Sequence, residues 1–406
     1  MNPHRSEKRY CALRALGLVT ALGQGADDTW TRLTTGDQSR LSVREDLVPG
    51  RRLVVGEVSG PLPHIPPHLR AYTSRNNQLA MAAVHQIEPE VRAVMNVVGP
   101  ERVAVVMGTS TSGAAEAQHA IGHHVRTGAL HPQFDCAQLE HGGLTKFLAA
   151  CTGAQGLAYT LSTACSSAAK ALASARALLA LDLCDAVVAG GADSLCGLTA
   201  NGFHALQAIA DDPSNPFSVN RKGLTLGEGA AIFLLTRDAG GIQLVGAGEA
   251  SDAFHMSAPD PEGTGAEVAM RTALEDAGVV PDEVSYVNLH GTGTPLNDAM
   301  ESRAVHRIFG GATACSSTKP LVGHTLGASG AVELGFCWLM LTQWRDGLLP
   351  LLPHRWDALA DPALPSLQFV QVGEHLKITT RAFVMSNSFG FGGNNCALVL
   401  AAESPC

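Results

Sequence analysis

The segment Leu161-Ser-Thr-Ala-Cys165-Ser-Ser-Ala-Ala-Lys170 decides how the first half of the chain folds. Residues 158–164 form a short apolar run and residues 166–181 are rich in Ala and Leu, which predicts a strand, a sharp turn and a helix. Cys165 then lies at a helix N-terminus, where free N–H groups and the helix dipole favour a thiolate. We interpret Cys165 as a candidate nucleophile. The alternative is a small buried cysteine, which we expect for most of the ten cysteines.

The alternation of strand and helix continues on both sides of this segment and predicts an α/β fold. In the first half we expect strands at residues 102–107 and 185–190 and a helix at 113–125. The second half repeats the order, with strands at 284–289, 381–385 and 396–401 and helices at 299–309 and 327–341. Turn residues at 236–241 predict a boundary between an N-terminal half, 1–240, and a C-terminal half, 241–406.

Composition excludes several classes of protein. The net charge of −9 disfavours a nucleic-acid role. The sequence contains no run of about 18 apolar residues, so we expect no membrane span. Residues 1–9 are polar and do not resemble a signal peptide. The cysteines form no C-x-x-C pair, so we expect reduced thiols and a cytoplasmic protein.

Three further motifs carry side chains suited to chemistry. The motif His290-Gly-Thr-Gly-Thr-Pro295 follows a predicted strand. A histidine at the end of a strand is presented to a cleft; the alternative is a loop histidine that bonds the backbone. In Ser317-Thr-Lys319-Pro-Leu-Val-Gly-His324-Thr-Leu-Gly-Ala-Ser-Gly330, His324 occupies the place in the second half that Cys165 holds in the first; the alternative for Lys319 is a solvated surface lysine. Ser386-Asn-Ser-Phe-Gly390-Phe-Gly-Gly-Asn-Asn395 predicts a flexible glycine-rich loop.

Nucleotide and metal sites are disfavoured by spacing. The glycines of the last motif do not open a βαβ unit, as a dinucleotide fingerprint requires. His119, His123 and His124 share a predicted helix, but the residue after His119 is Ala120, which does not fit the H-E-x-x-H pattern. We predict no metal site and interpret these histidines as surface residues.

Taken together, the cysteine segment, H-G-T-G-T, K-x-x-x-G-H and G-F-G-G resemble the β-ketoacyl synthases of fatty-acid and polyketide assembly, in their ketosynthase I/II branch. The resemblance covers essentially the whole chain, from Gly17 onward. It implies the thiolase fold, in which two pseudo-symmetric αβαβα halves form a five-layer sandwich, usually in a dimer. Pro216-Phe-Ser218-Val-Asn-Arg-Lys222-Gly-Leu224 replaces the family's P-F-D-x-x-R-D-G-F and resembles the aryl-polyene-type ketosynthases; Asn394 and Ala258 replace a common Thr and Ser.

The resemblance also implies a role for each site residue. Cys165 matches the acyl-accepting nucleophile, and its backbone amide would form an oxyanion hole with that of Phe391, which matches the gating phenylalanine. His290 and His324 match the family's two catalytic histidines. Lys319 and Glu333 match the ion pair beside them. Residues matching contacts to the phosphopantetheine arm and the acyl pocket are Thr292, Thr294, Phe203 and Thr111.

The implied reaction is a decarboxylative condensation of malonyl-carrier protein with the acyl chain on Cys165. Both histidines would act as neutral hydrogen-bond donors. No metal or organic cofactor is implied, because the acyl carrier protein carries the phosphopantetheine. The expected partners are this carrier, malonyl and acyl thioesters, and an identical or related ketosynthase-like subunit. An acidic carrier calls for a basic docking patch, for which Arg70 and Arg75 are candidates unless they are ordinary solvated side chains.

Three rival functions share parts of this pattern. A thiolase acting on coenzyme A esters would carry a second cysteine in the final loop, where this chain has Phe391. A non-catalytic partner subunit of the chain-length-factor kind would lack the cysteine. A cysteine hydrolase would use Cys165 with one histidine and release a free acid. Asn394 and Asn395 do not lie in the Asn motif of chain-initiating synthases, so a Cys-His-Asn set is not predicted.

Overall fold

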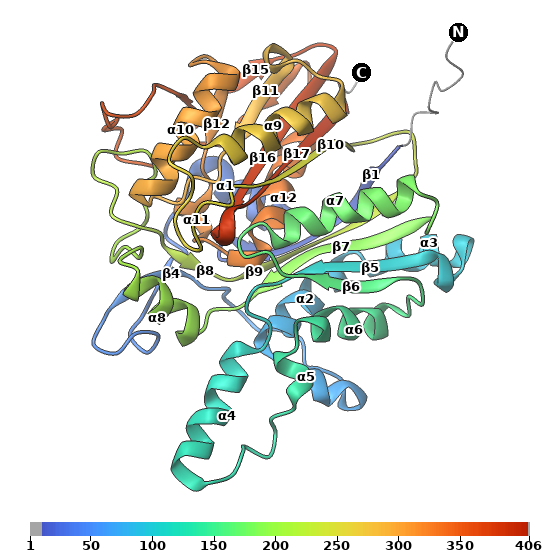
Figure 1. Cartoon of the computed structure of the whole chain (residues 1–406). Coiled ribbons are helices and arrows are strands. Elements are labelled where there is room, and N and C mark those ends of the chain that lie inside the picture. Colours follow the sequence, from blue (N-terminus) through green and yellow to red (C-terminus); the bar gives the residue numbers. More distant parts are fainter. Residues whose placement is uncertain (1–9, 405–406) are drawn as a thin grey trace.

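The computed structural model describes residues 10–404 (Figure 1). Our expectation for the polar segment 1–9 lies outside the described residues. Within the described part of the chain, no helix combines the length and the apolar character that a bilayer crossing requires.

The main sheet consists of two halves with the same strand pattern. The first half has the order β1, β9, β7, β5, β6, and the second has the order β10, β17, β16, β11, β12. In each half the first two pairings are antiparallel and the last two are parallel. The halves join where Ala12 of β1 pairs with Gln243 of β10. This repeat confirms the predicted pseudo-symmetric α/β fold.

The strand bounds differ from the sequence prediction mainly at the ends. The first half contains β1 (Ala12–Thr20), β5 (Val103–Gly108), β6 (Ala158–Leu161), β7 (Ala186–Asp193) and β9 (Gly229–Thr236). The second half contains β10 (Gln243–Ser251), β11 (Val284–Asn288), β12 (Ala314–Ser316), β16 (Arg381–Gly390) and β17 (Asn394–Glu403). Two short strands, β2 (Gly23–Gln24) and β14 (Gln368–Phe369), complete this sheet. Smaller sheets contain β3 (Ser42–Arg44), β4 (Leu53–Gly56) and β8 (Leu226–Gly227), and β13 (Leu348–Pro350) with β15 (His375–Lys377).

Helices cover both faces of each half, which gives five layers (Figure 1). On the outer face of the first half lie α2 (Arg75–Gln86) and α6 (His141–Thr152). Between the halves lie α7 (Ser167–Ala180) and α12 (Ser329–Thr342), which contact each other and strands of both halves. The outer layer of the second half consists of α9 (Thr264–Ala277) and α10 (Pro295–Phe309). The other helices are α1 (Ala26–Thr35), α3 (Glu88–Val98), α4 (Ala114–Thr127), α5 (Cys136–Leu139), α8 (Gly197–Ala205) and α11 (Lys319–Val322).

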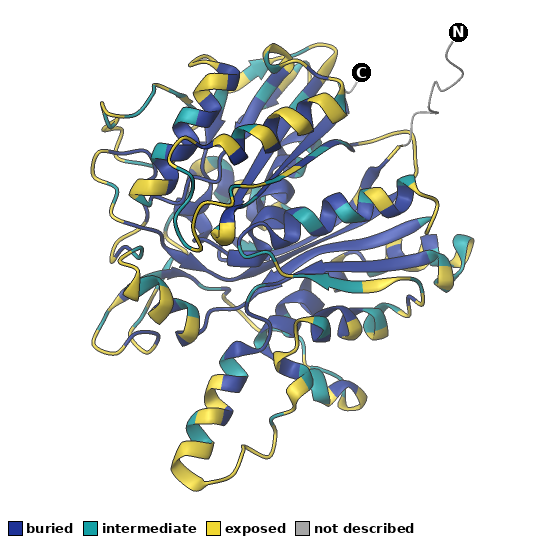
Figure 2. Ribbon diagram, viewed as in Figure 1, coloured by how far each residue is buried: buried dark blue, intermediate teal, exposed yellow. Residues whose placement is uncertain are grey.

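Small residues allow the two central helices to approach each other. A Cβ added at Gly330 of α12 would lie 2.6 Å from the Cβ of Ala169 in α7, so only glycine fits at this crossing. The largest buried apolar cluster takes residues from both halves, among them Leu172, Phe233, Leu334 and Val384. Figure 2 shows that buried residues concentrate in the sheet and the inner helices, whereas α4 projects from the body with an exposed tip. The two halves therefore share one core.

Several predicted element bounds are wrong for a physical reason. The predicted strand at 158–164 ends at Leu161, because the chain must turn to reach Cys165. The strand predicted at 381–385 continues to Gly390, and the glycine-rich loop shrinks to the turn Phe391–Gly393. The helix predicted from 299 begins at Pro295, a residue well suited to a first helical position. Strand β9 ends at Thr236 and β10 begins at Gln243, and the boundary at 240 stays a prediction.

Candidate active site

The turn between β6 and α7 places Cys165 at the centre of the molecule. Ala164 adopts a positive φ of 51°, which bends the chain sharply before the cysteine. The hydroxyl of Ser167 accepts a hydrogen bond from Thr163 N (2.9 Å) and donates one to Ala164 O (2.6 Å). The Ser-Ser pair of the motif therefore stabilises the turn, and Cys165 is 7% exposed.

The electrostatic expectation for Cys165 needs a correction. Burial raises the pKa of its thiol to about 11, although the nearby Lys319 and the N–H of Phe391 act in the opposite direction. Desolvation of the charged form thus outweighs the stabilisation of the thiolate by Lys319 and by the N–H of Phe391. The resting group is the thiol, and forming the nucleophilic thiolate requires a nearby base.

His324 supplies a nitrogen at the required distance. Its Nε2 lies 3.0 Å from the Sγ of Cys165. The backbone of His324 is held by strand β8, because His324 N donates to Thr225 O (2.7 Å) and Gly227 N donates to His324 O (2.9 Å). A base and a thiol are therefore brought into contact from opposite halves of the chain.

His290 completes a compact trio with these two residues. The rings of His290 and His324 are perpendicular, with centroids 5.2 Å apart. One ligand atom from each of Cys165, His290 and His324 lies within 4.8 Å of the others. Burial, and secondarily the charge of Lys319, hold the pKa of both histidines well below the usual range. Both imidazoles are consequently neutral at pH 7, and each retains one N–H that can donate to a developing anion.

Lys319 is buried in the active site, so the surface interpretation is wrong for it. Its side chain is 1% exposed and its Nζ lies 2.5 Å from Oε1 of the equally buried Glu333. The same ammonium group lies 3.3 Å from Nδ1 of His290. Because an ammonium group can only donate, Nδ1 is the acceptor and the proton of His290 resides on Nε2. The ion pair thereby fixes the tautomer of one catalytic histidine.

Phe391 and Phe203 lie together at the outer side of the site. Their ring centroids are 5.4 Å apart, and Phe391 is 36% exposed. The backbone N–H of Phe391 hydrogen-bonds the thiol of Cys165. An amide in an oxyanion hole would lie in the same place, beside the nucleophile. A Cβ at Gly390 would stand 3.1 Å from Cys165 N, so glycine keeps the second amide accessible. The structure thus brings together both amides and both rings singled out in the sequence.

The three threonines expected to contact substrate differ in their positions and hydrogen bonds. Thr292 and Thr294 lie on the turn after His290, with their hydroxyls 2.9 Å apart. Thr292 is buried and Thr294 precedes α10. Thr111 is buried and uses both its N–H and its hydroxyl to donate to Asp193, so its methyl group is the part free to contact an acyl chain. The binding roles of all three stay predictions.

Two functional carboxylates escaped the sequence analysis. Glu301 accepts hydrogen bonds from the N–H groups of His290 and Gly291, each at 2.7 Å. Asp298 accepts from Gly293 N (3.2 Å) and from Phe217 N (2.8 Å). Burial raises the pKa of Glu301 to about 7 and that of Asp298 to about 6. The available signal was their spacing of three residues in the helix that begins after the His290 motif, which places both on one face.

The remaining histidine and arginine expectations have mixed outcomes. Among the described residues, the catalytic trio is the one group of three or more ligand side chains close enough to hold a metal ion, and His119, His123 and His124 do not form another. Arg75 is engaged, because it pairs with the fully buried Glu228 through both its Nε and an NH2 group. We therefore withdraw Arg75 as a docking candidate.

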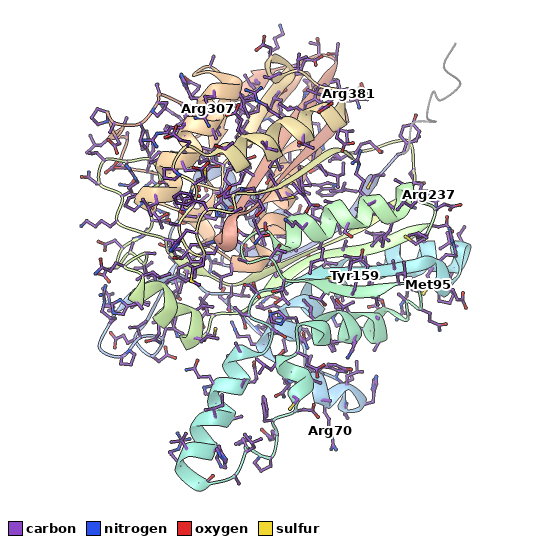
Figure 3. All side chains as sticks on the ribbon, in the orientation of Figure 1. Arg70, Met95, Tyr159, Arg237, Arg307 and Arg381 are labelled. Carbon is purple, nitrogen blue, oxygen red and sulfur yellow. The ribbon has the colours of Figure 1, made fainter. Side chains whose placement is uncertain are left out.

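Arg70 remains available on the surface. Its side chain extends outward near α5 (Figure 3), beside a cavity of about 880 Å³ that is also lined by Glu116 and His131. No ion pair joins Arg70 to another residue within the described part of the chain. Its role in docking stays a prediction.

Comparison with known proteins gives a consistent family. The N-terminal domain of β-ketoacyl synthases matches residues 11–240, and the C-terminal domain of β-ketoacyl synthases matches residues 242–351. The 3-oxoacyl-[acyl-carrier-protein] synthase 2 of Coxiella burnetii is 31% identical over 97% of this chain and 99% of its own. A chain of the solved complex between the ketosynthase ApeO and its chain length factor ApeC from Xenorhabdus doucetiae is 42% identical, with a TM-score of 0.91 over 99% of this chain and 100% of that one. A β-ketoacyl synthase from Burkholderia phymatum is 27% identical, with a TM-score of 0.85 over 98% and 100%.

Proposed function

The chain belongs to the β-ketoacyl synthase family, and we propose that it condenses malonyl-carrier protein with an acyl chain held on Cys165, with loss of carbon dioxide. The observation that carries this proposal is the trio itself. A thiol lies 3.0 Å from one neutral histidine, and a second neutral histidine has its tautomer fixed by Lys319. This set contains one nucleophile and two donors, which is what the two half-reactions require.

In the first half-reaction Cys165 takes the acyl chain from its carrier. The thiol proton moves to Nε2 of His324 while Sγ attacks the thioester carbonyl carbon. The amides of Cys165 and Phe391 stabilise the oxyanion, and each such donor is typically worth about 10²–10³ in rate. The carbonyl then reforms, and the carrier thiolate leaves with the proton returned by His324. His324 Nδ1 has no hydrogen-bond partner in the described structure, so its tautomer is not locked as that of His290 is.

In the second half-reaction malonyl-carrier protein loses its carboxylate as carbon dioxide. The electron pair of the broken carbon–carbon bond forms an enolate, whose oxygen accepts hydrogen bonds from Nε2–H of His290 and His324. The enolate carbon attacks the acyl thioester on Cys165 and displaces the thiolate, which takes up a proton from solvent because the loss of carbon dioxide releases none. Because carbon dioxide departs in place of a proton, the step needs donors and no strong base. Lys319 with Glu333 therefore acts by orienting and tuning His290, not as a base.

The partners follow from this chemistry. We propose an acyl carrier protein that brings its own phosphopantetheine, with no further cofactor on this chain and a cytoplasmic location. Thr292 and Thr294 contact the phosphopantetheine arm, and Thr111 and Phe203 line the acyl pocket. The similarity to a chain of the ApeO–ApeC complex supports pairing with a related subunit, and the P-F-S segment supports aryl-polyene-type elongation. A second identical copy is the alternative partner.

Intact-protein mass tests the proposal. Mixing the protein with acyl-carrier protein should add one acyl mass, and Cys165→Ala should abolish the gain. Malonyl-carrier protein should then discharge the acyl group as a β-ketoacyl product two carbons longer. Equal loading from coenzyme A esters with reversible cleavage would indicate a thiolase, and release of free acid would indicate a hydrolase. Loading that appears only after a related subunit is added would establish that subunit as obligatory.

A further inference from the structure

One fully buried carboxylate joins two segments beside the active site that come from different halves of the chain. Asp193, the last residue of β7, is 0% exposed. It accepts hydrogen bonds from the hydroxyl groups of Thr109 (2.6 Å), Ser110 (2.6 Å) and Thr111 (2.7 Å). It also accepts from the N–H groups of Ser110 (3.0 Å) and Thr111 (2.8 Å). The whole segment that leads to the acyl pocket thus converges on one side chain.

The same carboxylate holds the turn that follows His324. Gly327 N donates to Asp193 Oδ2 at 2.6 Å and to the hydroxyl of Ser110 at 3.2 Å. A Cβ added at Gly327 would lie 2.6 Å from Asp193 Oδ2 and from Ser110 N, so the turn is packed directly against the pocket segment. His324 is three residues before Gly327 and contacts Cys165. Any shift of Asp193 is therefore transmitted to both segments.

Both segments need an outside anchor. Ser112, directly after the pocket segment, has a φ of 47°, and Leu326, in the turn after His324, has a φ of 52°. Non-glycine residues in this region cost on the order of 1–3 kcal/mol each and persist only where the surroundings hold them. The hydroxyl of Ser112 itself donates to Gln138 O and Glu140 O. Asp193 holds the adjacent residues, Thr111 directly before Ser112 and Gly327 directly after Leu326.

We propose that Asp193 is a positioning residue that fixes the acyl-pocket segment and the His324 turn relative to each other. Selection of the acyl chain and the His324–Cys165 contact are then set together by one carboxylate. The first of these consequences rests on the proposed function; the second concerns the geometry of the site alone. Ser110 is the most informative residue to mutate, because its hydroxyl donates to Asp193 and accepts from Gly327 N.

The test compares Ser110→Ala and Asp193→Asn with the native protein in two assays. The first is the rate of Cys165 alkylation by iodoacetamide against pH, which reports proton transfer from the thiol to His324 and needs no carrier protein. The second is the ratio of acyl loading from short and long acyl-carrier proteins. His324→Ala sets the scale of the first assay. Thr145→Val is the matched control, because it removes a buried hydroxyl that bonds Thr160 and has no hydrogen bond to Asp193, Ser110 or Gly327.

We expect Ser110→Ala to slow alkylation at pH 7 by about tenfold and to change the loading ratio by a similar factor, with Thr145→Val leaving both unchanged. A folded Ser110→Ala variant that changes one readout and keeps the other at its native value overturns the coupling, as does a variant that changes neither. If Asp193→Asn does not fold, Ser110→Ala carries the test alone. If the native chain accepts no acyl group even with a related subunit added, the proposed function fails, while alkylation still decides whether this network positions His324.

Discussion

The Lys319–Glu333 pair allows stability and catalysis to be separated by mutation. Both side chains are at most 2% exposed, and their charged atoms are 2.5 Å apart. Removing one partner of such a pair leaves an uncompensated buried charge, which typically costs about 3–5 kcal/mol. Replacing both by apolar residues of similar volume is often neutral or stabilising. We therefore predict that Lys319→Met and Glu333→Leu each destabilise strongly, and that the double variant recovers most of the lost free energy of unfolding.

Activity should not recover with stability. Lys319 donates to Nδ1 of His290, and without it the proton of His290 is free to reside on either nitrogen. The double variant then lacks the enforced Nε2–H donor at the enolate oxygen. One well-placed donor is worth about 10²–10³ in rate, so we expect malonyl decarboxylation to fall by roughly 10²-fold in Lys319→Met and to stay low in the double variant.

Denaturant unfolding and a malonyl decarboxylation assay on the four proteins test this reasoning. The predicted signature is a coupling energy of several kcal/mol in stability combined with no rescue of decarboxylation. Additive losses of stability would show that the two charges do not depend on each other. A stable double variant with native decarboxylation would show that the ion pair has no part in orienting His290.

Three further predictions use single variants. Gly390→Ala places a Cβ 3.1 Å from Cys165 N and should slow acyl loading by up to about 10²-fold in single-turnover mass spectrometry, while Gly202→Ala, where a Cβ meets open space, should not. Burial raises the pKa of Glu301 from 4.5 to about 7, so the folded state binds this proton more tightly than the unfolded state does. We therefore compare the unfolding free energies of the native protein and of Glu301→Gln. The native value minus the variant value should fall by about 3 kcal/mol as pH rises from 4.5 to 7. Burial lowers the pKa of His354 from 6.5 to about 4, so the unfolded state binds this proton more tightly than the folded state does. The unfolding free energy of the native protein minus that of His354→Asn should fall by about 3 kcal/mol as pH decreases from 6.5 to 4. A flat difference in either pH series would contradict the assigned burial effect.

The sequence was sufficient to predict the α/β class, the repeat of element order and the equivalent places of Cys165 and His324 in the two halves, while the family resemblance added His290 to the same site. These features depend on local periodicity and on motifs at strand ends, which are written in short segments. The thiol state of Cys165 could not be predicted in this way, because the burial that raises its pKa comes from segments far apart in the chain. The burial of Lys319 is of the same kind, since its partner Glu333 lies on another helix.

The carboxylates that support the site were missed for a related reason. Glu301 accepts from backbone N–H groups, and Asp193 does so in addition to accepting from hydroxyl groups. Every residue except proline has such an N–H, so no residue type at a fixed spacing reveals these backbone partners. Their function appears only when the tertiary structure places a carboxylate beside a turn whose N–H groups have no partner in a strand or helix. Buried acidic residues next to glycine-rich turns are thus candidates for positioning roles that motif analysis does not detect.

The duplicated fold explains why the nucleophile and its base meet. Cys165 lies between β6 and α7, and His324 lies between β12 and α12, which are equivalent places in the two halves. The two helices pack against each other near their N-terminal ends, where Gly330 lies on Ala169. Residues that immediately precede these helices must therefore converge at the interface between the halves. His290 joins them from the end of β11, and its equivalent place in the first half is the end of β5, where the segment bound by Asp193 begins. Pseudo-symmetry thus supplies four adjacent positions, of which three carry Cys165, His324 and His290 and the fourth begins the segment bound by Asp193.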